Sequence, residues 1–316
     1  MITADKIRVP NEKESLNLSI GIMIVLTVIL LGLSIGLLII PLLLSILYVK
    51  VTQGQFLGNS VKVTENQFPE IYDMVSLASK NLSMVAPDVF IKQSPELNAF
   101  ALGILGRKSV VLHSALVETM SSAELASIIG HEFTHIKCEH TTWSVIAGLH
   151  NSIPIPIVSN LLGFVFNKWS RKAEYTSDRG GLIVCQNLNA SVSAMAKLAV
   201  GKELFKRLDL DILKQQKKQI SQDEISRLSE SLQTHPYTIN RIQEIINFSN
   251  SSSYESLISN IDGYRTELND EINSDEANNS DSPPMTYDSF CIECGENMPS
   301  EYLICLNCGA IKNEES

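Results

Sequence analysis

The stretch His131-Glu132-Phe133-Thr134-His135 decides the fold and chemistry expected of this chain. Ser121 and Glu124 precede it with the spacing of a capping box, so we expect the stretch to lie on a helix. Because residues four apart share one face of an α-helix, both imidazoles can reach the same metal ion. Glu132 projects beside that ion, where it can hold a metal-bound water and take its proton. The alternative is two helix histidines beside a surface glutamate.

A third metal ligand has to come from elsewhere in the chain. The sixth position after His135 holds Thr141, which excludes the metzincin pattern of three histidines. The segment 171–178, Arg-Lys-Ala-Glu-Tyr-Thr-Ser-Asp, offers Glu174 as a carboxylate ligand and Asp178 one helical turn later. Asp178 is suited to accept the outer N–H of a ligand histidine. Alone, this pair would be a solvated helix face; with the histidines it predicts a catalytic zinc site that has an open position.

A second zinc site is predicted near the C-terminus. Two C-x-x-C pairs separated by ten residues supply four thiolates for a closed structural site, and they predict a short zinc ribbon over 289–311. The four residues are Cys291, Cys294, Cys305 and Cys308. Disulfide or redox roles are disfavoured, because so short a module has almost no core without metal. The ribbon is expected to bind a protein partner or the substrate, and its thiols indicate a reducing compartment.

The charge of the chain is concentrated in one place. The chain has 316 residues and a net charge of −10, and residues 266–288 hold seven acidic and no basic residues. We therefore expect an acidic, flexible linker over 265–288. No basic stripe is present to bind a phosphate backbone, so nucleic acid is excluded as a partner.

An uncharged run of 34 residues, 16–49, predicts a membrane anchor. About 20 apolar residues cross a bilayer as a helix, and two crossings would need about 40 and a turn. We therefore expect one transmembrane helix over 18–49, after an N-terminal segment 1–17, with a buried core helix as the alternative. Basic residues flank the run almost evenly, so they do not indicate which end of the helix faces the cytoplasm. The expected orientation follows instead from the C-terminal thiols, which indicate a reducing compartment. The chain is expected to be a single-pass protein of the plasma or inner membrane, with its catalytic domain in the cytoplasm.

Residues 50–264 are expected to form one α+β domain, mostly helical with a small sheet. Strands are expected at 61–64, 89–92, 98–102 and 109–113, and later helices at 191–208, 221–232 and 236–248. Thr64 and Gln67 have the spacing of a further capping box.

The apolar segment 143–166 interrupts this domain. His135 before it and Glu174 after it must meet at one ion, so the chain must return to the side it left. We expect a re-entrant or interface-lying hairpin with its turn near Pro154 and Pro156. The alternative is a helix pair buried against the body of the domain.

The helix motif and the segment 171–178 together resemble the HtpX-like family of membrane zinc metallopeptidases, which includes the prenyl-protein (CaaX) endopeptidases. These are gluzincins, with a glutamate ligand downstream of H-E-x-x-H. The similarity covers about 61–248 and extends to three weaker features, His140, the stretch 98–101 and His235-Pro236 with Arg241. HtpX itself has more membrane spans and no cysteine-rich tail, so its topology and substrate are not carried over.

The resemblance implies a role for each matching residue. His131, His135 and Glu174 would bind the catalytic zinc, Glu132 would be the general base, Asp178 would support the ligands and His235 would help to stabilise the oxyanion. The stretch Asn98, Ala99 and Phe100 could pair as an edge strand with an extended peptide, although an ordinary interior strand is as plausible.

Three hypotheses about function follow. The first is a membrane-anchored zinc endopeptidase that acts on protein or peptide substrates, membrane or misfolded proteins among them, and that contacts the lipid bilayer. The second is a catalytically silent membrane adaptor that uses the ribbon to bind partners. Retention of Glu132 argues against it, since a scaffold needs no general base. The third is a zinc hydrolase of a non-peptide bond, which the metal-site residues do not distinguish from a peptidase.

Overall fold

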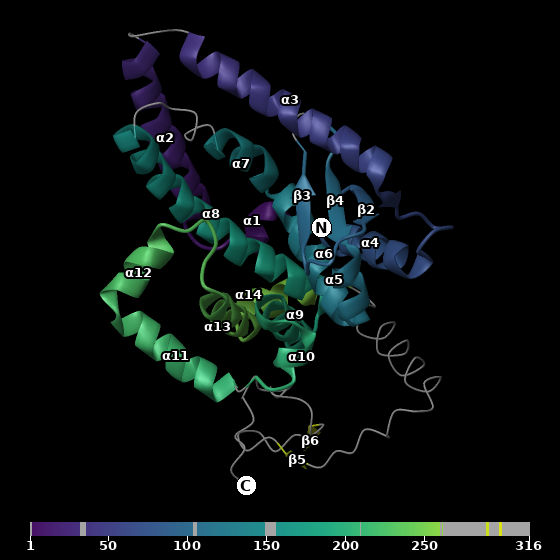
Figure 1. The fold of residues 1–316 in the computed structure, drawn as a ribbon. Helices are drawn as coiled ribbons and strands as arrows, with labels where there is room; N and C mark the ends of the chain where they lie inside the picture. The colour runs from purple at the N-terminus through teal and green to yellow at the C-terminus, as the bar shows by residue number, and fades with distance from the viewer. Residues whose placement is uncertain are drawn as a thin grey trace.

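A computed structural model of the chain describes residues 2–31, 36–103, 106–148, 156–208, 210–259, 261, 289–290 and 297–298. Within these residues, the body of the protein is mostly helical and contains one small sheet of four strands (Figure 1). The α+β prediction for the domain is confirmed.

The helices are α1 (Ala4–Ile7), α2 (Glu12–Leu31), α3 (Gly36–Asn59), α4 (Pro69–Asn81), α5 (Ser114–Thr119), α6 (Ser122–Lys137), α7 (His140–Gly148), α8 (Pro156–Cys185), α9 (Leu188–Val200), α10 (Lys202–Phe205), α11 (Leu210–Gln222), α12 (Glu224–Ser231), α13 (Thr238–Ser249) and α14 (Ser252–Ile258). The strands are β1 (Val61–Lys62), β2 (Asp88–Lys92), β3 (Ala99–Leu102), β4 (Ser109–His113), β5 (Ser289–Phe290) and β6 (Asn297–Met298).

The four-stranded sheet has the order β1-β2-β4-β3. β2 and β4 are parallel, with Phe90 opposite Val111, and the two outer pairs are antiparallel. Every residue of β4 is buried, as expected for a central strand whose middle residues are valine and leucine. β3 pairs with β4 alone among the described residues, so it is an edge strand rather than an interior one.

Helices α6 and α8 cross in close contact at the centre of the body. Small residues at the crossing permit this approach: a Cβ atom at Gly180 would overlap the side chain of Thr134, and one at Gly130 would lie 2.7 Å from Cβ of Val184. Most of the buried apolar residues of the domain pack around this pair, among them Ile129. The crossing therefore fixes the position of α8 relative to the H-E-F-T-H stretch of α6.

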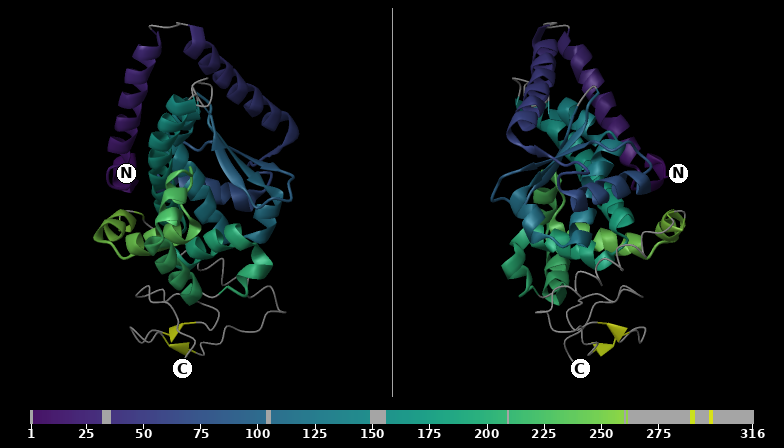
Figure 2. Two further views of the ribbon diagram at one scale, coloured as in Figure 1. Left: turned by 60° about the vertical axis from the view of Figure 1, so that its left-hand side comes forward. Right: turned by 90° about the vertical axis from the view of Figure 1, so that its right-hand side faces the viewer.

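The uncharged run 16–49 is divided between two helices. α2 has 20 residues and α3 has 24, and the two helices diverge from the top of the view along opposite flanks of the body (Figure 2). The prediction of one helix over 18–49 is wrong, because α2 ends at Leu31 and α3 begins at Gly36. Each helix reaches its length by extending beyond the uncharged run, α2 from Glu12 and α3 to Asn59. Among the described residues, no helix combines the length and the apolar character needed to cross a membrane.

The apolar segment 143–166 is shared between α7 and the first part of α8. Both helices pack with α2 in a second apolar cluster, which includes Leu16, Ala147, Leu162, Phe166 and Trp169. The chain returns to the side it left, as expected, because α7 begins beside the H-E-F-T-H helix and α8 leads back to it. The predicted turn at Pro154 lies outside the described residues, and contact of this segment with a membrane stays a prediction.

Several predicted helix boundaries are displaced. Thr64 and Gln67 pair with each other through their backbones, and α4 begins only at Pro69, a residue that suits the first turn of a helix. The helix expected at 191–208 ends at Gly201, whose φ of 82° cannot continue a helix. The helix expected at 221–232 starts after Asp223, whose carboxylate accepts the N–H of Ser226 at 2.8 Å and caps α12.

The C-terminal region is described only at its two short strands. β5 pairs with β6 in antiparallel orientation, with Phe290 opposite Asn297. The acidic linker 265–288 and the four cysteines of the predicted ribbon lie outside the described residues.

We predict that Gly180→Ala destabilises the folded state by about 1–3 kcal/mol, because the added methyl group forces α6 and α8 apart. Thermal unfolding of the purified chain, followed by circular dichroism, measures the effect. Gly54→Ala is the matched control: a Cβ there meets nothing within 4 Å, and alanine favours a helix by up to about 1 kcal/mol. Equal melting temperatures for the two variants would contradict a tight crossing at Gly180.

Candidate metal centre

Helix α6 places both histidines of the motif on the face that meets α8. The predicted capping box is formed: Ser121 N–H donates to the Glu124 carboxylate at 2.8 Å, and the Ser121 hydroxyl accepts the N–H of Glu124 at 3.4 Å. Phe133, between the two histidines in sequence, is fully buried on the opposite side. The capped start and the apolar back thus fix the rotation of the helix, and with it the direction of His131 and His135.

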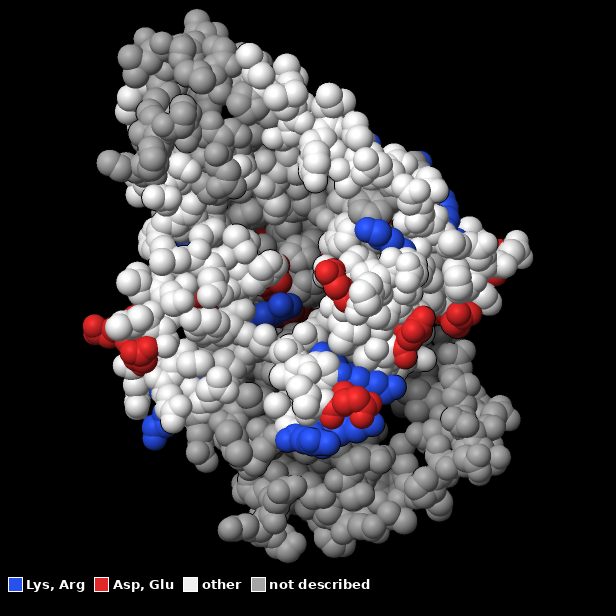
Figure 3. Space-filling model, in the orientation of Figure 1, with Lys and Arg blue, Asp and Glu red and all other residues white. Residues whose placement is uncertain are grey.

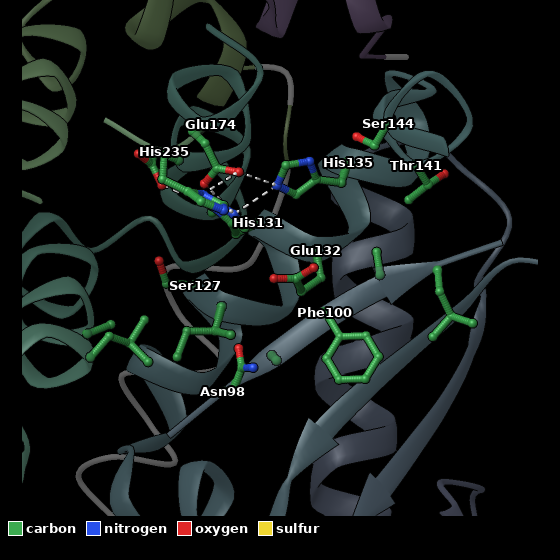
Figure 4. Close-up of a pocket in the computed structure, with 18 of the residues that line it drawn as sticks. Asn98, Phe100, Ser127, His131, Glu132, His135, Thr141, Ser144, Glu174 and His235 are labelled. Carbon is green, nitrogen blue, oxygen red and sulfur yellow. Dashed lines mark hydrogen bonds and ion pairs between the residues drawn. The ribbon is translucent and has the colours of Figure 1, made fainter. Parts of the chain in front are cut away.

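Two imidazoles and one carboxylate converge on a common point (Figure 4). Nε2 of His131 lies 3.0 Å from Nε2 of His135, and Glu174 Oε2 and Oε1 lie 3.7 and 3.5 Å from those two nitrogens. Tetrahedral zinc with bonds of about 2.0–2.1 Å places its ligand atoms about 3.3 Å apart. The three side chains therefore fit a zinc-type ion and could hold it.

Asp178 and Arg241 fix the imidazole of His131 on the side away from the metal cluster. Asp178 Oδ1 lies 3.0 Å from Nδ1 of His131, and Arg241 donates to both carboxylate oxygens at 2.6 and 2.9 Å. Burial opposes the charge of Asp178, but the ion pair with Arg241 outweighs it and lowers the pKa of Asp178. The carboxylate therefore accepts the Nδ1–H of His131 and leaves Nε2 with a free lone pair toward the metal.

The second imidazole is supported by a different pair of residues. Nδ1 of His135 lies 3.2 Å from Nδ1 of His140, and Nε2 of His140 lies 3.0 Å from a carboxylate oxygen of Glu12. Burial holds the pKa of His135 well below its usual range, so the ring is neutral, as a metal ligand must be. Sequence reasoning singled out His140 but missed Glu12, because no local signal distinguishes it from Glu14 two residues later at the start of the same apolar run.

Glu132 lies between the metal cluster and β3 (Figure 4). Glu132 is buried, with only 7% of its surface exposed to solvent. Burial raises its pKa, and the opposing charge of His131 and a backbone hydrogen bond from Ala101 only partly offset this effect. Glu174 behaves differently: burial acts in the same direction, but a hydrogen bond from His235 and the charge of Arg241 hold its pKa well below the usual range. The two glutamates are thus suited to different roles, proton acceptor and anionic ligand.

His235 reaches the cluster from a loop that α8 holds in place. Its Nδ1 lies 3.2 Å from Glu174 Oε1, while 65% of its side chain is exposed. The hydrogen bond to Glu174 raises the pKa of His235. Arg171 donates to the carbonyls of Ser231 and Gln233 at 2.7 and 2.9 Å, and so fixes the loop just before the histidine. Sequence reasoning did not assign this role to Arg171.

A cleft of about 520 Å³ opens in front of the cluster. The space-filling view shows a hollow at the centre of this face, with acidic and basic side chains inside it (Figure 3). The predicted substrate stretch Asn98, Ala99 and Phe100 lines one wall, and Ile128, Ser191, Ala194, Met195 and Leu198 from α6 and α9 line another. Val49 of α3 and Thr141, Ser144 and Val145 of α7 close the end toward the N-terminal helices.

Comparison with known proteins agrees with this geometry. A model of peptidase family M48 matches residues 65–248, which is more than half of the chain. The chain belongs to peptidase family M48. It is similar to the plastoglobule-localized metallopeptidase 48, chloroplastic, of Arabidopsis thaliana, with 32% identity over 217 residues that cover 64% of this chain and 63% of the relative. The chain thus spans less than two thirds of the length of this relative. The resemblance to the HtpX-like metallopeptidases is confirmed at the level of the family.

The matched M48 region contains every residue predicted for the catalytic zinc site. The structure brings these residues together around one cleft: His131, Glu132, His135, Glu174, Asp178, His235 and the stretch 98–100. Glu12 lies outside the matched region, although it is part of the same hydrogen-bonded cluster.

We predict that Asp178→Asn weakens zinc binding by about 10–100-fold, because the amide no longer fixes the tautomer of His131 and no longer pairs its charge with Arg241. Competition with a chromophoric chelator measures the affinity. Asp73→Asn on the exposed side of α4 removes the same charge away from the site. Zinc affinities that are equal in the two variants would contradict the role given to Asp178.

Proposed function

We propose that this M48 chain is a zinc-dependent endopeptidase in which Glu132 is the general base. The observation that carries the proposal is the convergence of His131, His135 and Glu174 beside a buried glutamate, in a cleft bordered by an edge strand. The metallopeptidase name of the Arabidopsis relative supports the same reaction class. A silent adaptor would need neither a buried general base nor an open cleft, so the geometry favours the enzyme.

The residues of the site divide the reaction among them. When bound by the two imidazoles and Glu174, zinc would polarise the scissile carbonyl and make a water molecule more acidic. Glu132 would take the proton of that water as it attacks the carbonyl carbon, and would then deliver the proton to the leaving amine. The raised pKa of Glu132 suits both steps, because a more basic carboxylate accepts the proton readily and still releases it to an amine.

His235 is proposed to stabilise the oxyanion. It lies at the open side of the cleft, and its pKa is raised by the hydrogen bond to Glu174, so its ring carries a proton more readily than an ordinary histidine. A cation or N–H donor at this place would contribute about 3 kcal/mol of transition-state stabilisation.

The stretch Asn98, Ala99 and Phe100 is proposed to bind the substrate backbone. β3 has one edge that no described strand covers, and that edge belongs to the wall of the cleft next to Glu132. An extended peptide can add to such an edge through main-chain hydrogen bonds. Main-chain hydrogen bonds select little for the amino-acid sequence of the substrate. This binding mode therefore suits an endopeptidase that accepts unfolded or extended segments of protein substrates.

We predict that Glu132→Gln retains the zinc affinity of wild type but loses about 10²–10⁴-fold in kcat on an unfolded protein substrate, since the amide cannot accept a proton. Zinc content and cleavage are measured on the same preparation. Glu139→Gln, at an exposed site just after α6, is the matched control. Turnover of Glu132→Gln at the wild-type rate would remove the general-base assignment.

We also propose that α2, α3 and the first part of α8 anchor the chain in a lipid bilayer. Large apolar side chains on these helices are about half exposed or more, among them Val25, Val28, Ile29, Leu43, Leu44, Leu47 and Leu161. The described surface over α3 carries few charges in the space-filling view (Figure 3). An apolar surface of this extent is unfavourable in water and typical of a lipid or protein interface. The cleft ends at Val49 of α3, so substrates would be cut close to that surface.

We predict that the double variant Leu44→Lys/Leu47→Lys reduces the fraction of protein that floats with phosphatidylcholine vesicles, because each lysine costs up to about 3 kcal/mol within the hydrocarbon. Leu204→Lys is the matched control, since Leu204 on α10 is 59% exposed and Leu44 is 58% exposed. Equal flotation of wild type and both variants would contradict anchoring through α3.

The four cysteines are proposed to bind a second, structural zinc. Their spacing supports a ribbon, and thiolates of this kind require a reducing compartment such as the cytoplasm. Joined to the body by an acidic segment, the ribbon would recruit a protein partner or the substrate to the cleft.

A further inference from the structure

A chain of hydrogen-bonding groups leads from the metal cluster to the N-terminus of the protein. Nδ1 of His135 lies 3.2 Å from Nδ1 of His140, whose Nε2 lies 3.0 Å from Oε1 of Glu12. His140 is 2% exposed and Glu12 is 1% exposed. Neither residue is a predicted metal ligand. His140 contacts the outer ring nitrogen of the ligand His135, as Asp178 contacts the outer ring nitrogen of the ligand His131.

The direction of these hydrogen bonds follows from what His135 must do. If Nε2 of His135 binds a metal, its proton is on Nδ1, which then donates to Nδ1 of His140. That nitrogen must accept, so the proton of His140 is on Nε2 and is donated to Glu12. One carboxylate therefore sets the tautomer of two imidazoles in succession, and it orients the lone pair of His135 toward the metal.

Glu12 is itself held by contacts that span the chain. Its second carboxylate oxygen accepts the hydroxyl of Thr176 from α8, and Arg8 Nε lies 3.4 Å from the first oxygen. The same threonine hydroxyl accepts the N–H of Val9 at 3.1 Å, and Arg8 donates to the carbonyl of Cys138 at 2.8 Å. The carboxylate is thus fixed in both position and rotation.

The segment before Glu12 is docked in the core. Ile2 and Ile7 are buried in the main apolar cluster, and Lys172 donates to the carbonyl of Pro10 at 2.9 Å. Glu12 is also the first residue of α2, the first of the two apolar N-terminal helices. Docking of the N-terminal segment and support of the metal ligand therefore occur through the same residue.

We propose that Glu12 is a positioning residue of the metal centre: through His140 it orients His135, so that the site is complete only when the N-terminal segment is docked. The proposal rests on the proposed function only in that the site binds zinc. A purely structural role for Glu12, in holding the N-terminus, would alter stability and leave the metal site unchanged.

The test compares three full-length variants in detergent, in a chain whose four C-terminal cysteines are replaced by serine so that the catalytic metal site is measured alone. Glu12→Ala removes the acceptor, Glu12→Gln keeps an acceptor oxygen without the charge, and Glu14→Ala removes an exposed carboxylate from the same helical turn. Each protein is stripped with a chelator, its fold is checked by circular dichroism, and its zinc affinity is measured by competition. We expect Glu12→Ala to lose about 10–100-fold in affinity, Glu12→Gln to lose less, and Glu14→Ala to equal wild type.

Two further measurements separate positioning from stability. Cobalt replaces zinc, and its visible absorption reports the ligand field of His135; we expect both Glu12 variants, Glu12→Gln included, to shift the bands. In a His140→Ala background, Glu12→Ala should cause little further loss of affinity, because the two residues act in series. Unchanged zinc affinity and cobalt spectra in both Glu12 variants, or full additivity with His140→Ala, would overturn the proposal.

A reference variant separates this inference from the proposed function. His135→Ala removes a predicted ligand, so zinc that it still binds at wild-type affinity belongs to other sites. If wild type and His135→Ala bind zinc equally, the catalytic zinc site itself is wrong. If they differ while the Glu12 variants match wild type, only the role of Glu12 is wrong.

Discussion

The close crossing of α6 and α8 is the constraint on which the site depends. Two imidazoles separated by one helical turn can face a common point, but a tetrahedral ion also needs a ligand from outside that helix. Glu174 supplies it only because glycines at the contact let α8 approach until its carboxylate lies 3.5–3.7 Å from the imidazole nitrogens. The buried aliphatic core around the crossing packs against both helices and holds this geometry.

The approach of the two helices also brings several charged side chains together in the interior, where each of three carboxylates has a cationic or histidine partner. Asp178 is matched by Arg241, Glu174 by His235 and Arg241, and Glu12 by Arg8 and His140. A buried carboxylate without such a partner would be protonated or would destabilise the fold. Glu132 has no ion pair of this kind among the described residues, and the raising effect of burial on its pKa is not outweighed, as it is at Asp178 and Glu174. The residue proposed to exchange protons is thus the one whose charge is least compensated.

Local signals in the sequence were sufficient for the part of the site that one helix carries. The capping box of Ser121 and Glu124 and the i, i+4 histidines are properties of neighbouring residues, and α6 formed as expected. The spacing of Glu174 and Asp178 also indicated a shared face. The position of β3 at the edge of the sheet was left open, because strand order depends on pairing between distant segments.

Long-range contacts account for what the sequence did not reveal. Glu12 reaches His140 only after residues 2–12 dock on the core, and nothing near either residue in sequence indicates that contact. The break of the uncharged run into α2 and α3 was missed for a related reason. The count of apolar residues stopped at the first charges, whereas the helices continue through polar residues that pack on the body, such as Gln53, which donates to the Arg107 carbonyl at 2.9 Å.

Zinc K-edge X-ray absorption of the full chain tests the central claim most directly, once the four C-terminal cysteines are replaced by serine so that one metal remains. The account predicts one zinc per chain with two imidazole nitrogens at about 2.0–2.1 Å, oxygen ligands and no sulfur. A chain that binds no zinc after this replacement, or a metal without imidazole ligands, would contradict the convergence of His131, His135 and Glu174 on one ion.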